Sequence, residues 1–168
     1  MAIKIDKRTL APAGPVVSEP PADTAGKPAA ANVDYSRLMT KLTTGDRSPK
    51  SLNALGVCHL RLGNYSEAVR IFRGITLQSG CTWERDDVPP LYRRNFATAL
   101  LLDGLPAGCK SVLQTAELAD HPRAREILAA IKRWERSLSF FQRWDWRLNG
   151  VTPKNCHIPI DFEPGEFE

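Results

Sequence analysis

The sequence predicts an all-α protein, a short helical solenoid of about five to six helices. Three observations indicate this. Apolar residues recur every three or four positions through most of the chain, prolines and glycines separate these segments, and one helical hairpin is followed by a weaker copy of itself. The chain divides into a disordered Pro/Ala-rich arm (1–33), a helical domain (34–148) and an extended acidic tail (149–168).

The arm has neither a helical nor an alternating pattern of apolar residues. It combines Ala, Gly and small polar residues with five prolines: Pro12, Pro15, Pro20, Pro21 and Pro28. Proline removes backbone donors, and the small residues offer little surface to bury. We therefore expect residues 1–33 to be disordered.

The helical domain begins with a short helix after Asp34, a residue type that caps helix N-termini. Two helices follow between Ser48 and Leu77, and a polar loop covers residues 78–90. The next helix spans residues 91–103, and another begins at Pro106. A long final helix is expected from Pro122 to Leu148, because apolar residues recur along it at helical spacing.

The hairpin between Ser48 and Leu77 carries a spaced set of large and small residues. Large residues alternate with small ones that allow two helices to cross closely, and Gly63 ends the first helix. The set is Leu52, Leu55, Gly56, His59, Gly63, Tyr65, Ala68 and Phe72. This pattern resembles the tetratricopeptide (TPR) repeat, with Leu52 in place of the aromatic residue and His59 in place of the tyrosine.

A second, degenerate copy lies 41 residues further on. Phe96 and Ala97 correspond to Leu55 and Gly56, and Gly104 corresponds to Gly63. The resemblance covers about 100 residues, from Ser48 to roughly Trp146, and the last helix would cap the array. Terminal repeats need such a cap because they otherwise expose their stacking face.

The resemblance implies a concave groove, lined by the first helix of each repeat, that binds a peptide or protein partner. The expected groove residues are Asn53, Val57, Leu60 and Arg61 in the first repeat and Arg94, Asn95, Thr98 and Leu101 in the second. Asn and Arg side chains can hydrogen-bond a peptide backbone or a carboxylate. Solvated helix residues without a ligand remain an equally weighted alternative.

The tail is a second candidate occupant of this groove. Its acidic residues outnumber its single Lys154, whereas the preceding helix is rich in arginine. Opposite charges and three apolar anchors (Ile158, Ile160 and Phe162) suggest that residues 150–168 fold back along the helices. Exposed ion pairs add only about 0–1 kcal/mol each, so the apolar anchors would have to dominate.

No catalytic residues, cofactor or metal site are expected. The sequence has no phosphate-binding glycine loop, nucleophile elbow or HExxH motif, and His59 is expected to pack in the repeat core. The four cysteines are widely spaced, and neither a secretory signal nor a long apolar stretch is present. A cytoplasmic protein without membrane contact is the resulting expectation.

Two other functions compete with the protein-binding adaptor. The basic residues of 122–147 could serve a nucleic-acid accessory protein, although they form no single stripe and the formal net charge is only +4. Exposed tryptophans could instead pair copies of a self-assembling unit: Trp134 is expected in the core, but Trp144 and Trp146 cannot both face one side of a helix, so at least one is exposed or covered by the tail. The sequence does not identify the partner, the pathway or the oligomeric state.

Overall fold

The computed structural model describes residues 34–114, 116–154 and 156–168, and in them the regular elements are helices. Their bounds are α1 Tyr35–Thr44, α2 Pro49–Arg61, α3 Tyr65–Thr76, α4 Pro90–Leu102, α5 Pro106–Leu113, α6 Ala116–Ala119, α7 Pro122–Ser137 and α8 Phe140–Asn149. An isolated antiparallel bridge joins Leu77 and Glu84. The all-α prediction is confirmed for these residues, while the arm that we predicted to be disordered lies outside them.

Local sequence signals explain where most helices begin and end. The side chains of Asp34 and Ser48 accept hydrogen bonds from backbone N–H groups in the first turns of α1 and α2. Proline occupies the first turn of α2, α4, α5 and α7. Gly63 and Gly104 follow α2 and α4 with φ values of 80° and 79°, a conformation that glycine adopts without steric cost.

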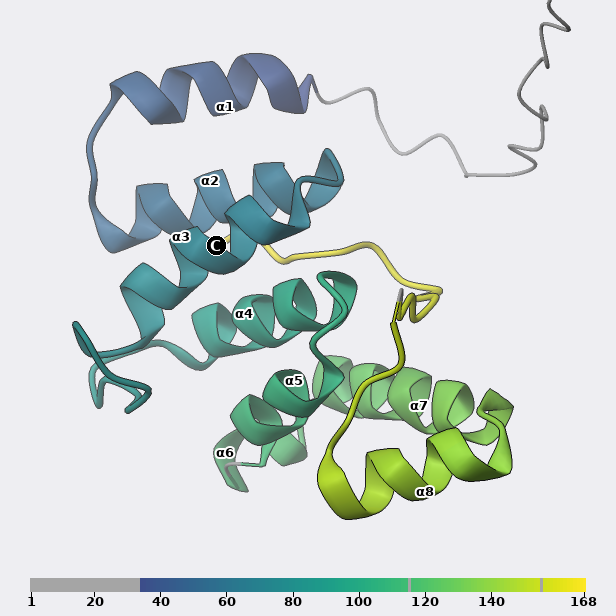
Figure 1. The fold of residues 1–168 in the computed structure, drawn as a ribbon. Coiled ribbons are helices and arrows are strands. Elements are labelled where there is room, and N and C mark those ends of the chain that lie inside the picture. The colour runs from purple at the N-terminus through teal and green to yellow at the C-terminus, as the bar shows by residue number, and fades with distance from the viewer. Residues whose placement is uncertain (1–33, 115, 155) are drawn as a thin grey trace, which may run out of the picture. The chain divides into compact units, whose positions relative to one another are not determined.

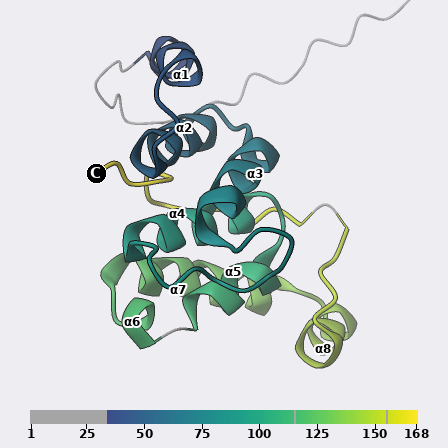
Figure 2. The same cartoon turned by 90° about the vertical axis from the view of Figure 1, so that its left-hand side faces the viewer.

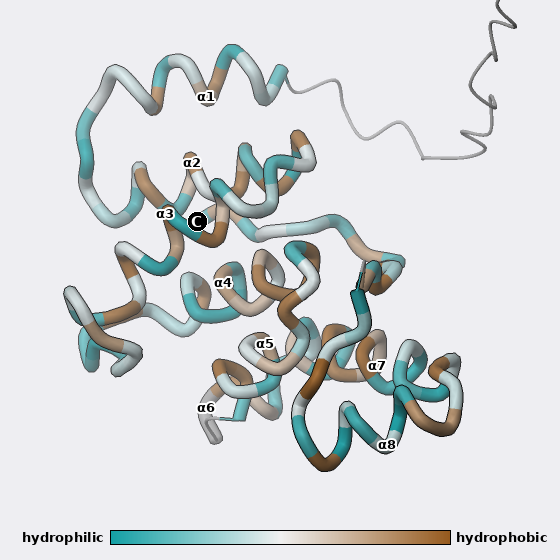
Figure 3. The backbone as a smooth tube through the Cα atoms, viewed as in Figure 1, coloured by the Kyte–Doolittle hydropathy of each residue, from teal (hydrophilic) through white to brown (hydrophobic). Residues whose placement is uncertain are grey.

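Helices adjacent in the sequence pack against one another. Contacts join α1 to α2, α2 to α3, α3 to α4 and α4 to α5, and α4 also contacts α2 and α7 (Figures 1 and 2). Such sequential packing is typical of helical repeat arrays. Helix α1 buries none of its residues, and its tube is mostly white and teal in Figure 3, whereas α4 buries nine of its thirteen residues.

The core of the first hairpin depends on a glycine facing an aromatic ring. A Cβ atom added at Gly56 would lie 2.6 Å from Cζ of Phe72, which is closer than such atoms approach. Ala68 and Phe72 are fully buried, while Leu52, Leu55, His59 and Tyr65 are half-buried. The small residue at position 56 is therefore what permits α2 and α3 to pack this closely.

The second hairpin keeps the small residue and changes the large one. Ala97 in α4 and Cys109 in α5 are fully buried, and Leu113 is 1% exposed where the first hairpin has Phe72. Phe96 is buried beside Ala97. Each predicted packing residue of the two hairpins is thus at least partly buried, except the turn residue Gly63, which is exposed.

The predicted long helix from Pro122 to Leu148 is wrong. Leu138 has an extended conformation (φ −66°, ψ 145°), and Ser139 begins α8 with a capping box that includes Gln142. The Arg143 side chain donates hydrogen bonds to the backbone oxygens of Glu135, Arg136 and Leu138, which satisfies carbonyls that the break leaves without helical partners. Because of this break and of α6, the described residues contain α1 to α8 where about five to six helices were expected.

The tail, residues 150–168, has no helix among its described residues and turns back toward the first hairpin. It leaves α8 at Gly150 and returns past α4 to α2 (Figures 1 and 2). The backbone oxygen of Cys156 lies against Gly104, and Ile158 is 1% exposed. Residues 34–168 accordingly form one compact unit that includes the tail.

Candidate functional site

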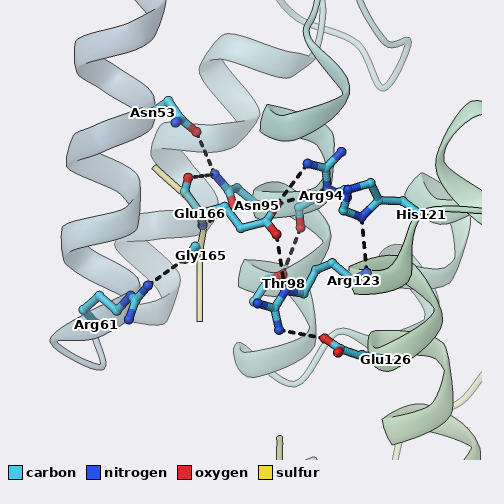
Figure 4. Close-up of polar contacts among 10 residues, drawn as sticks. All are labelled: Asn53, Arg61, Arg94, Asn95, Thr98, His121, Arg123, Glu126, Gly165 and Glu166. Atoms are coloured by element: carbon cyan, nitrogen blue, oxygen red, sulfur yellow. Dashed lines mark hydrogen bonds and ion pairs between the residues drawn. The ribbon is translucent and has the colours of Figure 1, made fainter. Parts of the chain in front are cut away.

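The last residues of the tail lie on a surface formed by α2, α4 and α7. We call this surface the tail-binding face and define it by its side chains that contact the tail: Lys50, Val57, Leu60, Arg61, Tyr92, Arg94, Asn95, Arg123 and Arg133. Figure 4 shows the polar contacts around Gly165 and Glu166. Five of the eight groove residues expected from the sequence belong to this face.

Asn95 binds the backbone of Glu166 through two hydrogen bonds. Its Nδ2 donates to the Glu166 carbonyl at 2.8 Å, and its Oδ1 accepts from the Glu166 N–H at 2.8 Å. Asn95 is 1% exposed, and its Nδ2 also donates to Oδ1 of Asn53 at 2.9 Å. Asn53 therefore fixes the orientation of the amide that binds the peptide backbone.

The carboxylate of Glu166 lies between two arginines from different helices. Arg94 donates from Nε and Nη2 to Oε2 at 3.1 and 3.0 Å, and Arg123 donates from Nε to Oε1 at 3.4 Å. The Arg94 and Glu166 side chains are 11% and 26% exposed. Charge-assisted hydrogen bonds at this level of burial are stronger than those between exposed groups.

Gly165 is buried beneath Arg61 in a left-handed backbone conformation. Its φ is 78°, and its carbonyl accepts a hydrogen bond from Nη2 of Arg61 at 2.8 Å. A Cβ atom at this position would lie 3.1 Å from both Leu60 Cδ1 and Val57 Cγ1. Space and backbone conformation both favour glycine here. Arg61 also forms an ion pair with Glu163, and its side chain is 9% exposed.

Contacts at the outer end of the face involve Glu168 and Phe167. Tyr92 donates its hydroxyl to Oε1 of Glu168 at 2.7 Å, and Lys50 Nζ lies 3.3 Å from Oε2. The Tyr35 and Phe167 rings are stacked with centroids 6.5 Å apart. Burial, reinforced by the Glu168 carboxylate, raises the pKa of Tyr92 to about 12, and the same hydrogen bond lowers the pKa of Glu168.

The basic helix α7 meets the acidic part of the tail at two positions. Arg133 Nη2 lies 3.1 Å from Oδ1 of Asp161, in an exposed pair. The Arg123 guanidinium lies over the Phe162 ring at 4.4 Å, and it also pairs with Glu126. Cation–π contacts of this kind stabilise by about 0.5–1 kcal/mol at exposed sites.

Three expected groove residues have other roles. Asn53 supports Asn95, Thr98 donates its hydroxyl to the backbone oxygen of Arg94 at 2.9 Å, and Leu101 is fully buried in the core. Helical spacing assigned Leu101 to a groove surface, but α4 packs against α2, α3, α5, α6 and α7, so most of its circumference is buried. Sequence reasoning also missed Tyr92, Lys50 and the use of Arg123, which depend on contacts between distant segments.

A second surface is formed by apolar side chains of α8. Phe140, Phe141, Trp144 and Leu148 are 71%, 82%, 59% and 65% exposed. Trp146 points the other way: it is 6% exposed and meets Trp134 edge to face at 5.3 Å between ring centroids. We call the four exposed side chains the α8 aromatic surface.

The thiols and His59 show no arrangement that would activate them. Burial raises the pKa of Cys58, Cys156 and Cys109, the last to about 12, and burial lowers the pKa of His59. Among the described residues, no group of three or more His, Cys, Asp or Glu side chains is placed to hold a metal ion. In the part of the chain that the structure describes, no helix is both long and apolar enough to cross a membrane.

Comparison with protein-family models, with curated proteins and with solved structures finds no match to this chain.

Proposed function

We propose that this chain is a non-enzymatic interaction module whose tail-binding face holds an extended acidic peptide segment. The observation that carries the proposal is the pair of hydrogen bonds between the Asn95 amide and the backbone of Glu166. The N–H and C=O groups of an extended segment have no partners within the segment. A side chain that pairs with both groups of one residue supplies these partners and so fixes the segment in place.

The proposal includes a TPR-like arrangement of the helices. Its support is the succession of hairpins α2–α3 and α4–α5, with small residues Gly56 and Ala97 at equivalent places in the first helices. In such an array the first helices face the ligand, and Arg61, Arg94 and Asn95 come from α2 and α4. The tail then occupies the position of a ligand within the same chain.

Charge supports an acidic ligand. Four arginines of the face pair with tail carboxylates: Arg61 with Glu163, Arg94 and Arg123 with Glu166, and Arg133 with Asp161 in an exposed pair. Removing one partner from such a half-buried pair leaves a desolvated charge, which disfavours neutral or basic segments at the same place. A partner protein would present the same chemistry and would compete with the tail.

The experiment uses the full chain with Glu166→Lys, which places a cation beside Arg94 and Arg123 and weakens the docking of the tail. A fluorescein-labelled peptide with the sequence of residues 158–168 is titrated with this variant and followed by fluorescence anisotropy. We expect saturable binding, which should disappear when Asn95→Leu is added to the variant. A scrambled peptide of the same composition is the control.

Two results would contradict the proposal. One is the absence of binding of the peptide to the Glu166→Lys chain. The other is equal binding of the intact and the scrambled peptide, because a general attraction between charges would then account for it. Far-ultraviolet circular dichroism verifies that each variant keeps its helices.

Self-association through the α8 aromatic surface is a second candidate function. It is favoured by the exposure of Phe140, Phe141, Trp144 and Leu148 along one short helix. Contiguous exposed apolar side chains of this size commonly mark interaction sites. Sedimentation equilibrium would show a mass that rises with concentration and reverts to the monomer value in Phe141→Ser; a constant monomer mass would exclude it.

A nucleic-acid role receives less support. Most basic side chains between residues 122 and 147 are engaged within the chain: Arg123 with Glu126 and Glu166, Arg125 with Asp120, Arg133 with Asp161, Arg147 with Glu135, and Arg143 with backbone oxygens. Cations that already neutralise carboxylates release fewer counterions from phosphates. An oligonucleotide that binds the full chain with a strong salt dependence would restore this alternative.

A further inference from the structure

We infer that the tail-binding face selects partner segments with the pattern acidic-x-Gly-Glu, in which the glycine adopts a left-handed conformation. This inference rests on the proposed peptide-binding function and specifies the class of segment that the face accepts. In the tail the pattern is Glu163-Pro164-Gly165-Glu166. Each defined position meets a different restriction on the face.

Two features restrict the residue at the glycine position: the side chains beneath it and its own backbone conformation. Val57 and Leu60 are fully buried side chains on α2, with 0% and 1% exposure, so they have little room to move. A Cβ atom on the peptide would lie 3.1 Å from each of them. The φ of 78° disfavours any L-residue at this position even where space could be made.

The left-handed glycine also has a consequence for its neighbours. Its carbonyl is held by Nη2 of Arg61, while the backbone of the next residue is held by Asn95. Arg61 and Asn95 lie on different helices, α2 and α4. A peptide without the left-handed turn would present these two groups in another direction and lose one set of bonds.

The glutamate position is defined by two arginines from different helices, α4 and α7. Arg94 binds Oε2 through two nitrogens, and Arg123 approaches Oε1. Glutamine keeps the shape but removes the charge, and the two cations would then face a neutral amide. The acidic residue three positions earlier pairs with Arg61, as Glu163 does, so it adds a second charge restriction next to the glycine.

The test compares peptides against one protein, the full Glu166→Lys chain. The parent peptide has the sequence of residues 158–168, and its variants replace the glycine by L-Ala, the glycine by D-Ala, or the glutamate after it by Gln. Any residual occupation by the tail reduces the apparent affinity of every peptide by the same factor, so affinity ratios are unaffected. Fluorescence anisotropy gives the dissociation constants.

We expect L-Ala to weaken binding by about tenfold or more, because a left-handed L-residue is disfavoured by about that factor before any contact is counted. D-Ala, which favours positive φ and places its Cβ elsewhere, should bind more tightly than L-Ala. Gln should weaken binding severalfold in low salt and less in high salt, because the lost term is electrostatic.

The outcomes separate this inference from the proposed function. If the parent and the L-Ala peptide bind equally, the glycine rule is overturned while peptide binding stands. If D-Ala weakens binding as much as L-Ala, the left-handed requirement is overturned. If the parent peptide fails to bind, the proposed function fails and the inference fails with it.

Discussion

The tail-binding face and the α8 aromatic surface differ in the side chains that form them: polar and charged groups covered by the tail on the face, and exposed apolar groups on α8. On the face, Asn95 is 1% exposed and hydrogen-bonds the tail backbone, and it is supported by Asn53, which is also 1% exposed. On α8, Phe141 and Trp144 are 82% and 59% exposed. The face therefore holds the tail through directional and charged contacts, whereas the α8 aromatic surface consists of exposed apolar side chains.

This difference has energetic consequences. Buried polar groups cost about 1–3 kcal/mol each when their partner is removed, so the face should be sensitive to the loss of the tail or of its own amides. Exposed apolar side chains on a short helix contribute little to folding, so α8 should tolerate substitution. Substitutions on the face should therefore lower stability more than substitutions on α8.

Asn95→Leu should have the largest effect. It removes three hydrogen bonds and leaves the Glu166 backbone and Asn53 without their partners, so we expect the free energy of unfolding to fall by about 2–4 kcal/mol. Urea denaturation measures the change. Asn149→Ala, which removes an exposed contact with Asp145, is the control and should change stability by less than about 0.5 kcal/mol. Equal effects of the two substitutions would show that the hydrogen bonds of Asn95 to the Glu166 backbone do not stabilise the fold.

Gly165→Ala should destabilise the chain by about 1–2 kcal/mol, because alanine is disfavoured at a φ of 78° and would press against Val57 and Leu60. Gly74→Ala is a matched control on α3, where an added Cβ meets nothing within 4 Å. Alanine is the better helix former, so this control should stabilise by about 0.5 kcal/mol. Thermal unfolding compares the two, and a neutral Gly165→Ala would argue against the buried, left-handed glycine.

Alkaline pH should weaken the outer end of the face. The pKa of Tyr92 is raised to about 12 in the folded chain from an ordinary value of 10.0, so its contribution is fully present below pH 10 and is lost as pH rises toward 12. We expect the free energy of unfolding to fall more steeply over this interval in the wild-type chain than in Tyr92→Phe. Parallel curves for the two proteins would contradict both the burial of the Tyr92 hydroxyl and its contact with Glu168.

Substitutions on the α8 aromatic surface should have the smallest effect on folding. Phe141→Ser and Trp144→Ser should each change the free energy of unfolding by less than about 0.5 kcal/mol, because both side chains are largely exposed. Urea denaturation at low protein concentration, where association is minimal, is the appropriate measurement. A loss above about 1 kcal/mol would mean that these side chains are covered within the folded chain.

The first hairpin could be predicted from the sequence because its signals are local. Gly56, Ala68 and Phe72 lie at spacings that predict a close helix crossing, and Gly63 supplies the turn. The signal for the break at Leu138 is also local, because Ser139 and Gln142 form a capping box. The apolar residues that continue at helical spacing through this point favour an unbroken helix instead. Choosing between the two signals required knowing that Phe141 is not buried.

The tail contacts were less predictable because they join distant segments. Charge opposition suggested that the tail could dock, and helical spacing suggested Asn95 and Arg94 as groove residues. Neither could pair Arg94 with Glu166, which is 72 residues away, or identify Arg123 as a second cation. Leu101 was misassigned because a spacing rule assumes one solvent face, whereas α4 lies among five other helices.

Docking of the tail on the face is tested most directly by the hydrogen-exchange rate of the Glu166 amide in the full chain, measured by nuclear magnetic resonance. This N–H belongs to an extended segment, and it donates to the side chain of Asn95. We predict that it exchanges about a hundredfold or more slowly than in an unstructured peptide, and that Asn95→Leu removes the protection. Exchange at the unstructured rate in the wild-type chain would contradict the account, because the tail would then not occupy the face.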